Sequence, residues 1–466
     1  MMHAQLEHLP LVRALFVIGP DGFIQHDTDY PGTPNGPRRS QARRRSTWCR
    51  YSGGHDRTVF RNGGRTQRMK DTWLVLGVTL AIQALVAMAL LTLPAMAPAV
   101  AQALGISAAY IGLYVAVVYA GAMLASLASG PAVARFGAIR VSQAGLVLCA
   151  VGLLLCAVPS VPAMAAGAVL VGLGYGPVTP ASSHLLARST PAERMSLVFS
   201  VKQTGVPLGG ALAGAIVPGL QLLAGWQGAL IGVALANLAC AALAQPLRQE
   251  LDADRDENTP MVMGRLGQPI ALVLSHPSLR LLAGCSFVFS ISQLSLTTYL
   301  VTYLTDTLAY GLVAAGLLLS VAQFGGIVGR VLWGWVSDRT LGARRTLTLL
   351  AVMMAAMALA TAALQASMPP PLVAGILVAF GASAIGWNGV YLAEVARQAP
   401  PGQAGLATGG TLTFTFLGVV LGPPLFGAVS GLVGSYRAGF AMLAVPTILC
   451  VFALMKYRAL PAAARP

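Results

Sequence analysis

Charged residues are scarce in this sequence. They make up 10% of its 466 residues, whereas roughly 25% is usual for a soluble domain. Apolar residues make up 56% of the chain, and the mean hydropathy is +0.71. Because a water-soluble protein of this length needs a largely charged and polar surface, this composition excludes a soluble globular fold.

Acidic residues are almost absent from the long apolar segments. None lies in such a segment before residue 247, and the later segments offer only Asp306 and Glu394, each at or just past a segment end. A cation at bilayer depth needs a negative partner, because an unpaired charge there costs roughly 2.5–3.5 kcal/mol on insertion scales. The sequence therefore offers little that would bind a cationic substrate.

Clusters of metal-binding or catalytic residues are missing as well. The six cysteines include no CxxC pair, and His184 is the only histidine within the apolar segments. The short apolar run at residues 9–19 has no basic leader and no small-residue cleavage site, so a signal peptide is not predicted. We therefore expect no metal, no cofactor, no disulfide framework and no enzymatic activity.

What the sequence does contain is a series of apolar segments of membrane-spanning length. A helix needs about 20 mostly apolar residues to cross the hydrocarbon. The segments predict an all-α membrane protein with twelve transmembrane helices. They run over residues 72–98, 107–129, 141–160, 163–187, 198–223, 225–246, 279–304, 311–336, 345–367, 371–393, 405–431 and 435–456.

The formal net charge of +15 indicates membrane orientation rather than nucleic-acid binding. Of the 30 Lys and Arg residues, 12 lie in the first 70 residues, a stretch without helical period that predicts a disordered basic tail. If the N-terminus is cytoplasmic, the outer loops between spans hold only Arg437. This asymmetry follows the positive-inside rule and predicts a multi-pass protein of the bacterial inner membrane with both termini in the cytoplasm.

The predicted spans form two groups of six. The longest connection, residues 247–278, contains the polar run LRQELDADRDENTP and predicts a solvated cytoplasmic linker. Because Met69 stands directly before the first span, a mis-assigned start with translation beginning at Met69 is an alternative to a translated tail. The expected domains are a tail at 1–70, a six-helix bundle at 71–246, the linker at 247–278, a second six-helix bundle at 279–458 and a tail at 459–466.

The two groups of spans also resemble each other in sequence. The second span ends in SGPAVARFGAIR and the eighth in WGWVSDRTLGARR, while the fourth leaves through LARSTP and the tenth through VARQAP. A second half that repeats the first is expected for transporters built from two six-helix bundles around a site at the bilayer midplane.

The stretch GWVSDRTLGARR resembles the loop signature of the major facilitator superfamily, a glycine, an Asp-Arg pair, a second glycine and a basic pair between two helices. The resemblance covers about residues 71–458 and implies the major facilitator fold with alternating access. KQTGVPLGG in the fifth span and GWNGVYLAEVAR in the tenth are similar to the bacterial branch that includes cyanate and organic-anion permeases. The motif residues expected to act in gating are Gly334, Asp338, Arg339, Gly342, Arg344 and Arg345, with Gly130, Arg135, Gly137 and Arg140 in the first-half copy.

The motif has a physical interpretation. Gly334 is expected to let helices approach closely, and Asp338 and Arg339 to form a charge-assisted lock with a neighbouring helix end, which in the family favours the outward-facing state. Ala134 stands where the family usually has Asp in the first-half copy, so the first-half lock is an open question. Ala168 likewise occupies a place where many proton-coupled members carry an intramembrane Arg.

Two basic residues lie inside the predicted spans. Lys202 is about one turn into the fifth span, and Arg330 lies roughly two turns inside the eighth. One interpretation is that they clamp an anionic group, with Arg offering a two-pronged contact to a carboxylate; in monocarboxylate and oxalate carriers of the family, an Arg at a similar place has this role. The alternative is that Lys202 extends to the cytoplasmic interface and Arg330 pairs with Asp338 or with helix-end carbonyls.

Uncharged polar residues recur where a central cavity is expected. The alternative is that each one holds helices together, through interhelical hydrogen bonds worth about 0.6–2 kcal/mol. Glu394 and His184 are candidates for proton coupling, against a local pair of Glu394 with Arg397 and a structural hydrogen bond of His184. The predicted substrate-binding residues are Lys202, Arg330, Gln83, Tyr114, Gln203, Gln293, Thr297, Trp387, Asn388 and Tyr391.

Together these features predict a monomeric secondary active transporter that moves a small organic or inorganic anion across the inner membrane, with or without a co-transported proton. Its expected partners are the solute, the proton and the lipid bilayer, and no nucleic acid. One alternative is a multidrug or metabolite efflux carrier of the same fold, which the GVVLGPPLFG pattern in the eleventh span permits. An alternative of another class is a non-transporting membrane sensor, for which a soluble domain would be expected.

Overall fold

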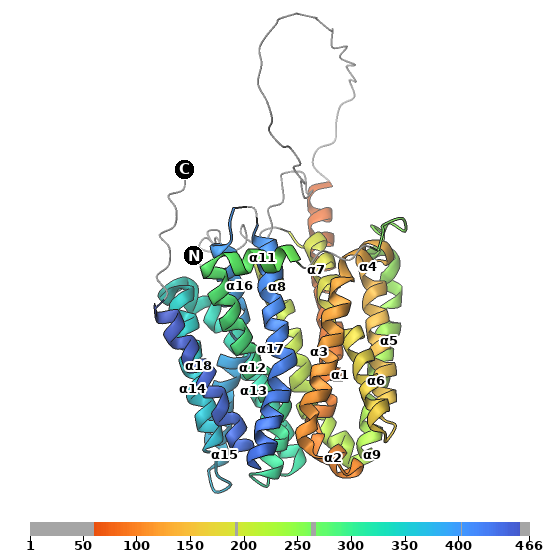
Figure 1. Ribbon diagram of the computed structural model, residues 1–466. Helices are drawn as coiled ribbons and strands as arrows, with labels where there is room; N and C mark the ends of the chain where they lie inside the picture. Colours follow the sequence, from red (N-terminus) through yellow and green to blue (C-terminus); the bar gives the residue numbers. More distant parts are fainter. Residues whose placement is uncertain (1–59, 192–193, 262–266, 402, 457–466) are drawn as a thin grey trace, which may run out of the picture.

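The computed structural model describes residues 60–191, 194–261, 267–401 and 403–456, and within these ranges every regular element is a helix. Most of the predicted tail at 1–70 and all of the tail at 459–466 fall outside them. The helices run side by side in two groups, α1 to α9 and α12 to α18, as Figure 1 shows. This arrangement is that of a multi-pass membrane protein.

Ten stretches of the described chain are long and apolar enough to span a bilayer. Two of them, Val198–Leu251 with 54 residues and Leu312–Ala362 with 51, would exceed 70 Å as single helices, against about 30 Å of hydrocarbon. Each contains a glycine at positive φ, Gly225 at 73° and Gly342 at 73°. Each of these two stretches is long enough for two crossings, so the ten stretches of the described chain fit the predicted count of twelve.

The first bundle is built from helices whose bounds follow the predicted spans. α9 contains two crossings, because its backbone leaves the helical conformation at Gly225 and brings Leu220 near Gly232. The elements are α1 (Phe60–Ala95), α2 (Ala97–Leu104), η2 (Ala108–Tyr110), α3 (Ile111–Leu127), α4 (Ser129–Phe136), α5 (Ala138–Cys156), α6 (Val161–Tyr175), α7 (Val178–Ser189), α8 (Met195–Gln203) and α9 (Gly205–Leu243).

The second bundle follows a connection that holds η4 (Gln245–Leu247) and α10 (Arg248–Leu251). The short helix α11 (Gly267–Ser275) lies across the top of the bundle in Figure 1, on the side where α12 begins. The remaining elements are α12 (Pro277–Asp306), α13 (Leu312–Val336), η5 (Ser337–Leu341), α14 (Gly342–Ala362), α15 (Pro370–Ala384), α16 (Asn388–Gln398), α17 (Ala404–Val433) and α18 (Tyr436–Lys456).

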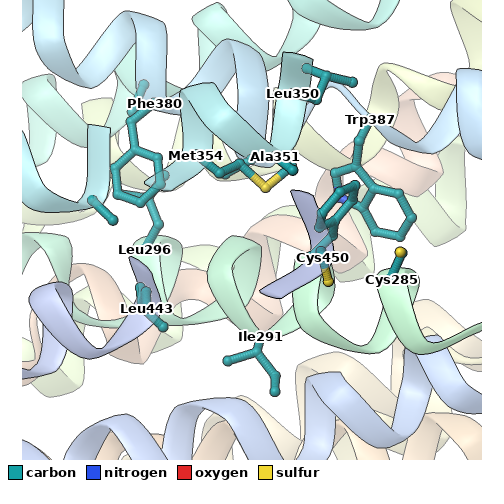
Figure 2. Close-up of a cluster of buried hydrophobic side chains, with 14 of the residues drawn as sticks. Cys285, Ile291, Leu296, Leu350, Ala351, Met354, Phe380, Trp387, Leu443 and Cys450 are labelled. Carbon is teal, nitrogen blue, oxygen red and sulfur yellow. The ribbon is translucent and has the colours of Figure 1, made fainter. Parts of the chain in front are cut away.

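Each bundle has its own apolar core. In the second bundle, α12, α14, α15 and α18 pack Leu296, Met354, Phe380 and Leu443 together (Figure 2). The outward faces are apolar too, as Leu449 with 63% of its surface exposed illustrates. Since lipid is as apolar as these side chains, the bundles are held together mainly by close packing and interhelical hydrogen bonds.

Close helix contacts in the two bundles occur at matching places. A Cβ on Gly172 of α6 would lie 2.1 Å from the Val118 carbonyl oxygen of α3, and a Cβ on Gly381 of α15 would lie 1.8 Å from the Ala322 carbonyl oxygen of α13. Only glycine permits these distances. The second and fourth spans therefore cross as the eighth and tenth do. This agrees with the similar sequences at the ends of these spans.

Several crossings are interrupted within the membrane-spanning region. The fourth breaks at Gly176 and Pro177 between α6 and α7, the tenth breaks between Ala384 and Asn388, and the fifth breaks at Thr204 between α8 and α9. A break leaves backbone carbonyls without their helical partners, so that side chains or solutes must satisfy them. These breaks determine where polar chemistry is placed in this fold.

The predicted linker differs from a fully solvated segment. Asp252 is only 3% exposed, and its carboxylate accepts hydrogen bonds from the backbone N–H groups of Ile139, at 2.7 Å, and Arg140, at 3.0 Å, at the start of α5. It packs against Gly137, whose φ is 92°. The linker thus supplies a carboxylate beside the loop in which the first-half motif has Ala134 in place of Asp.

The next acidic residue of the linker binds the end of α7. Asp254 lies 2.5 Å from Arg188 Nη1 and 2.7 Å from His184 Nε2. Partial burial raises the pKa of the Asp254 carboxyl, but the hydrogen bond with His184 and the charge of Arg188 lower it by more, so the pKa lies below its usual value of 3.8. The linker therefore attaches to the ends of two crossings of the first bundle.

Candidate functional site

Lys202 lies at the end of α8 and is 1% exposed. Its Nζ donates hydrogen bonds to the Thr179 carbonyl oxygen, at 3.1 Å, and to Ser183 Oγ, at 2.9 Å, both on α7. Neither partner is charged, and no ion pair found among the described residues includes Lys202. The ammonium is therefore buried inside the first bundle and does not extend to the interface.

Gln83 of α1 continues this polar cluster. Its Oε1 accepts a 2.9 Å hydrogen bond from Thr179 Oγ1, whereas its Nε2 is buried without an acceptor. A buried donor left unpaired costs roughly 1–3 kcal/mol. An anionic or carbonyl oxygen entering here would satisfy this amide and approach the ammonium of Lys202.

Arg330 of α13 connects the two bundles. Its Nη1 donates a 2.6 Å hydrogen bond to the Gln203 carbonyl oxygen in the first bundle, and its Nε donates at 3.2 Å to the Ile385 carbonyl oxygen at the break of the tenth crossing. Its partners are backbone carbonyls, as one of the two interpretations of the sequence expected. Within the described ranges it pairs with no carboxylate, Asp338 included.

The two basic side chains are linked through one short segment. Lys202 and Gln203 are consecutive, so the guanidinium that binds the Gln203 carbonyl lies close to the break that follows Lys202. Tyr175, at the end of α6, packs edge-on against Tyr119 with ring centroids 5.8 Å apart. The Gln203 side chain is partly buried and makes no hydrogen bond within the described ranges, whereas its backbone oxygen accepts from Arg330.

A second polar cluster lies inside the C-terminal bundle. Gln293 Oε1 of α12 accepts hydrogen bonds from Trp387 Nε1, at 3.0 Å, and from Asn388 Nδ2, at 3.4 Å. The indole of Trp387 is fully buried and packs against the Tyr391 ring at 5.1 Å. Thr297 bonds only to carbonyls of its own helix. Gln293, Trp387, Asn388 and Tyr391 thus form one group around the break between α15 and α16.

Tyr114 of α3 is the remaining predicted binding residue. Its hydroxyl is buried and makes no hydrogen bond. Like Gln83 Nε2, it is a polar group without a partner in the first bundle, and an unpaired buried donor favours a polar ligand or water.

The structure shows specific contacts for only some of the predicted gating residues. A Cβ on Gly334 or Gly130 would meet nothing within 4 Å, so the prediction that Gly334 permits close approach of helices is wrong. Arg344 donates to the Leu454 and Met455 carbonyl oxygens, at 2.8 and 2.7 Å, and so caps α18. Arg135 lies over the Phe136 ring at 5.6 Å. Among the described residues, Asp338, Arg339 and Arg345 take part in no ion pair.

The two candidates for proton coupling lie in local pairs. Glu394 is 3.0 Å from Arg397 Nε and accepts a 2.9 Å hydrogen bond from Gln398. His184 contacts Asp254 of the linker. Within the described ranges neither side chain bonds to Lys202 or Arg330, and their role in coupling stays a prediction.

Sequence reasoning missed the neutral partners of the two basic residues. Thr179 and Ser183 were not predicted, the Gln203 and Ile385 carbonyls were expected only as unspecified helix-end carbonyls, and Tyr175 was not singled out. The available signal was the cluster of proline and glycine at Gly176, Pro177 and Pro180 in the fourth span, which marks a helix break and hence a polar site.

Sequence comparisons identify similar proteins. A family model described as Major Facilitator Superfamily matches residues 78–416. An uncharacterized MFS-type transporter of Mycobacterium tuberculosis is 26% identical over 294 residues, 63% of this chain and 64% of that protein. Monocarboxylate transporter 13 of Bos taurus is 28% identical over 54% of this chain and 57% of its own. The chain therefore spans less than two thirds of these curated relatives.

A longer match is to the gentisate transporter of Corynebacterium glutamicum, which is 26% identical and aligns over 75% of this chain and 77% of its own. Among solved structures, the nucleoside transporter NupG has a TM-score of 0.66 at 16% identity and covers 82% of this chain and 99% of its own. At this identity the structural likeness concerns the fold alone.

Proposed function

Since the chain belongs to the major facilitator superfamily, we propose that it is a secondary active transporter of a small organic or inorganic anion that works by alternating access. The observation that carries the proposal is a pair of cationic side chains at the centre, one from each bundle, whose partners are neutral. Lys202 binds a carbonyl and a hydroxyl, and Arg330 binds two carbonyls.

The charge balance of the centre favours an anion. Removing a cation from water costs several kcal/mol, and neutral oxygens return only part of that amount. Within the described crossings, no carboxylate lies beside either cation. A carboxylate bound between them would supply the missing negative charge and would accept from the unpaired Gln83 amide. The names of similar proteins agree, since relatives include gentisate, 4-hydroxybenzoate and gallate transporters.

The geometry suggests how binding would be coupled to movement. Arg330 holds the Gln203 carbonyl of one bundle and the Ile385 carbonyl of the other. The Arg330 guanidinium binds a carboxylate through two parallel hydrogen bonds, which are stronger than its bonds to two carbonyls on separate helices. A carboxylate that displaces these carbonyls would therefore break the contact between the bundles. The anion would thus change the relative energies of the two states, which is what alternating access needs.

The orientation and assembly belong to the same proposal. In the described chain, the basic residues at helix ends lie on the side of α4, α11 and α16, whereas Arg437 at the start of α18 lies on the opposite side (Figure 1). By the positive-inside rule the linker side faces the cytoplasm, and the membrane is the bacterial inner membrane. The transporter is proposed to act as a monomer, with or without a co-transported proton.

The test is uptake into proteoliposomes that contain the full-length protein. Radiolabelled aliphatic and aromatic carboxylates are compared with a nucleoside and with a lipophilic cationic dye. The proposal predicts uptake of a carboxylate or another small anion, and loss of that uptake in Lys202→Gln and in Arg330→Gln at unchanged reconstitution. Transport of the dye alone, with no anion carried, would show a multidrug carrier and contradict the proposal.

A further inference from the structure

A groove of about 600 Å³ opens between α12 and α18, away from the central site. Each wall is one face of a helix, because the lining residues recur every three or four positions. They run from Pro277 to Val288 on α12 and from Pro446 to Lys456 on α18. Two of the lining residues are small, Gly284 on α12 and Ala453 on α18, and a Cβ on Gly284 would meet nothing within 4 Å. Cys285 and Cys450 lie side by side at its base (Figure 2).

The groove opens to the surface that the lipid surrounds. Leu449 lines it and is 63% exposed, and Val445, Phe452 and Met455 continue this exposed apolar face of α18. Eleven residues of α12 separate its two ends, so the groove is about 16 Å long. This is about half of the 30 Å hydrocarbon thickness, the depth of one bilayer leaflet.

One end of the groove carries two cations. Arg280 and Lys456 are both exposed and lie at the end where α12 begins and α18 finishes. Arg280 makes only a long 3.4 Å hydrogen bond to the Leu274 carbonyl oxygen, and neither side chain forms an ion pair among the described residues. An apolar slot of one leaflet's depth that ends in two unpaired cations complements a molecule with an anionic head and an apolar chain.

We propose that the groove between α12 and α18 is a binding site for one anionic phospholipid of the leaflet on the linker side, independent of the transported solute. The phosphate lies between Arg280 and Lys456, and an acyl chain follows Gly284 and Ala453 toward the membrane centre. A soluble anion alone does not fit this assignment, since it would leave the apolar length of the groove unfilled and would contact only exposed basic side chains.

The test uses the full-length protein in vesicles of equal parts phosphatidylglycerol and phosphatidylcholine, followed by mild extraction and native mass spectrometry of bound lipid. The wild type is expected to retain phosphatidylglycerol in preference to phosphatidylcholine. In Arg280→Gln/Lys456→Gln this preference falls roughly 25-fold, because each basic side chain near anionic lipid contributes on the order of a five-fold preference.

A second variant tests the acyl-chain part separately. A Cβ on Gly284 meets nothing within 4 Å, and Gly284 lines the groove, so Gly284→Leu is expected to occupy the groove and to reduce retention of both lipids. The matched control is Arg194→Gln/Arg255→Gln, which removes two exposed charges on the linker side but outside the groove, and it should retain lipid as the wild type does.

Three results would overturn the assignment: retention in proportion to the vesicle composition, equal loss in the control variant, or complete displacement of the lipid by inorganic phosphate. The last result would mean that only a soluble anion is recognised. Since the lining of the groove includes neither Lys202 nor Arg330, anion uptake by the same variants reconstituted in proteoliposomes is measured alongside to confirm that they are folded.

Discussion

Replacing Arg330 by lysine keeps the charge but removes the fork that reaches both bundles. The wild-type guanidinium contacts the Gln203 and Ile385 carbonyls with two different nitrogens, and the same two directions are available to a carboxylate. An ammonium on a flexible stem is expected to keep one such contact. A hydrogen bond to a charged group is worth about 1.5–3 kcal/mol, so the dissociation constant of the anion should rise about 10- to 150-fold.

The size of the effect can be followed by ligand-induced thermal stabilisation of the detergent-purified protein. At an anion concentration of 100 times the wild-type Kd, binding stabilises the protein by about 2.7 kcal/mol. If Arg330→Lys raises the Kd 100-fold, the same concentration equals the new Kd and the stabilisation falls to about 0.4 kcal/mol. The shift in Tm caused by the ligand should therefore shrink to roughly one seventh of the wild-type shift.

Arg344 offers a matched control in the same bundle. It too binds two backbone carbonyls, those of Leu454 and Met455, but it lies at the end of α18 and away from the centre. Arg344→Lys is expected to lower the basal Tm while leaving the ligand-induced shift unchanged. A full ligand shift in Arg330→Lys, or an equal loss in Arg344→Lys, would refute the assignment of Arg330 to the anion.

Three further predictions concern packing, the linker and the unpaired amide. Gly381→Ala places a Cβ 1.8 Å from a carbonyl oxygen and should destabilise the second bundle by about 1–3 kcal/mol, whereas Gly375→Ala, which meets nothing within 4 Å, should be neutral in thermal unfolding. Folding lowers the pKa of Asp254, so its carboxylate stabilises the fold above the unfolded pKa near 3.9, and this contribution is lost as the pH falls through the lower folded pKa. Asp254→Asn should therefore flatten the dependence of Tm on pH between about 5 and 3. Glu257→Gln, at an exposed site, should leave this dependence unchanged. Gln83→Leu removes both the unpaired donor and the acceptor of Thr179 Oγ1. It should therefore weaken anion binding several-fold, with at most about 1 kcal/mol lost from basal stability. A Tm loss with unchanged binding would identify the amide as purely structural.

The sequence was sufficient to predict the class of fold. The repeated apolar segments give the twelve crossings, and the position of Lys202 and Arg330 within them indicates where charge must be buried. The sequence allowed helix-end carbonyls as partners of Arg330, but it could not identify which carbonyls these are, nor the Thr179 carbonyl and Ser183 hydroxyl that bind Lys202, because the positions of these groups depend on helix breaks. The end of α15 at Ile385 depends on how α15 packs against α13 through Gly381. This packing cannot be predicted from the local sequence of α15.

The linker shows another limit of sequence reasoning. Its acidic run predicts exposure to water, yet Asp252 is buried against the start of α5, 113 residues earlier in the chain. The motif in the first half has Ala134 where the family usually has Asp, and a carboxylate from a distant segment lies beside that loop instead. Only tertiary structure reveals such a replacement, since nothing in the composition near Ala134 requires it.

The attachment of the linker also has a consequence for how the protein is made. Asp252 and Asp254 bond only to helices of the first bundle, so all the groups that they need have already been synthesised when they leave the ribosome. The remaining 210 or so residues take roughly 10–40 s to translate at 5–20 residues per second. The hydrogen bonds and ion pairs of the linker with the ends of α5 and α7 can therefore form while the second half is still being inserted.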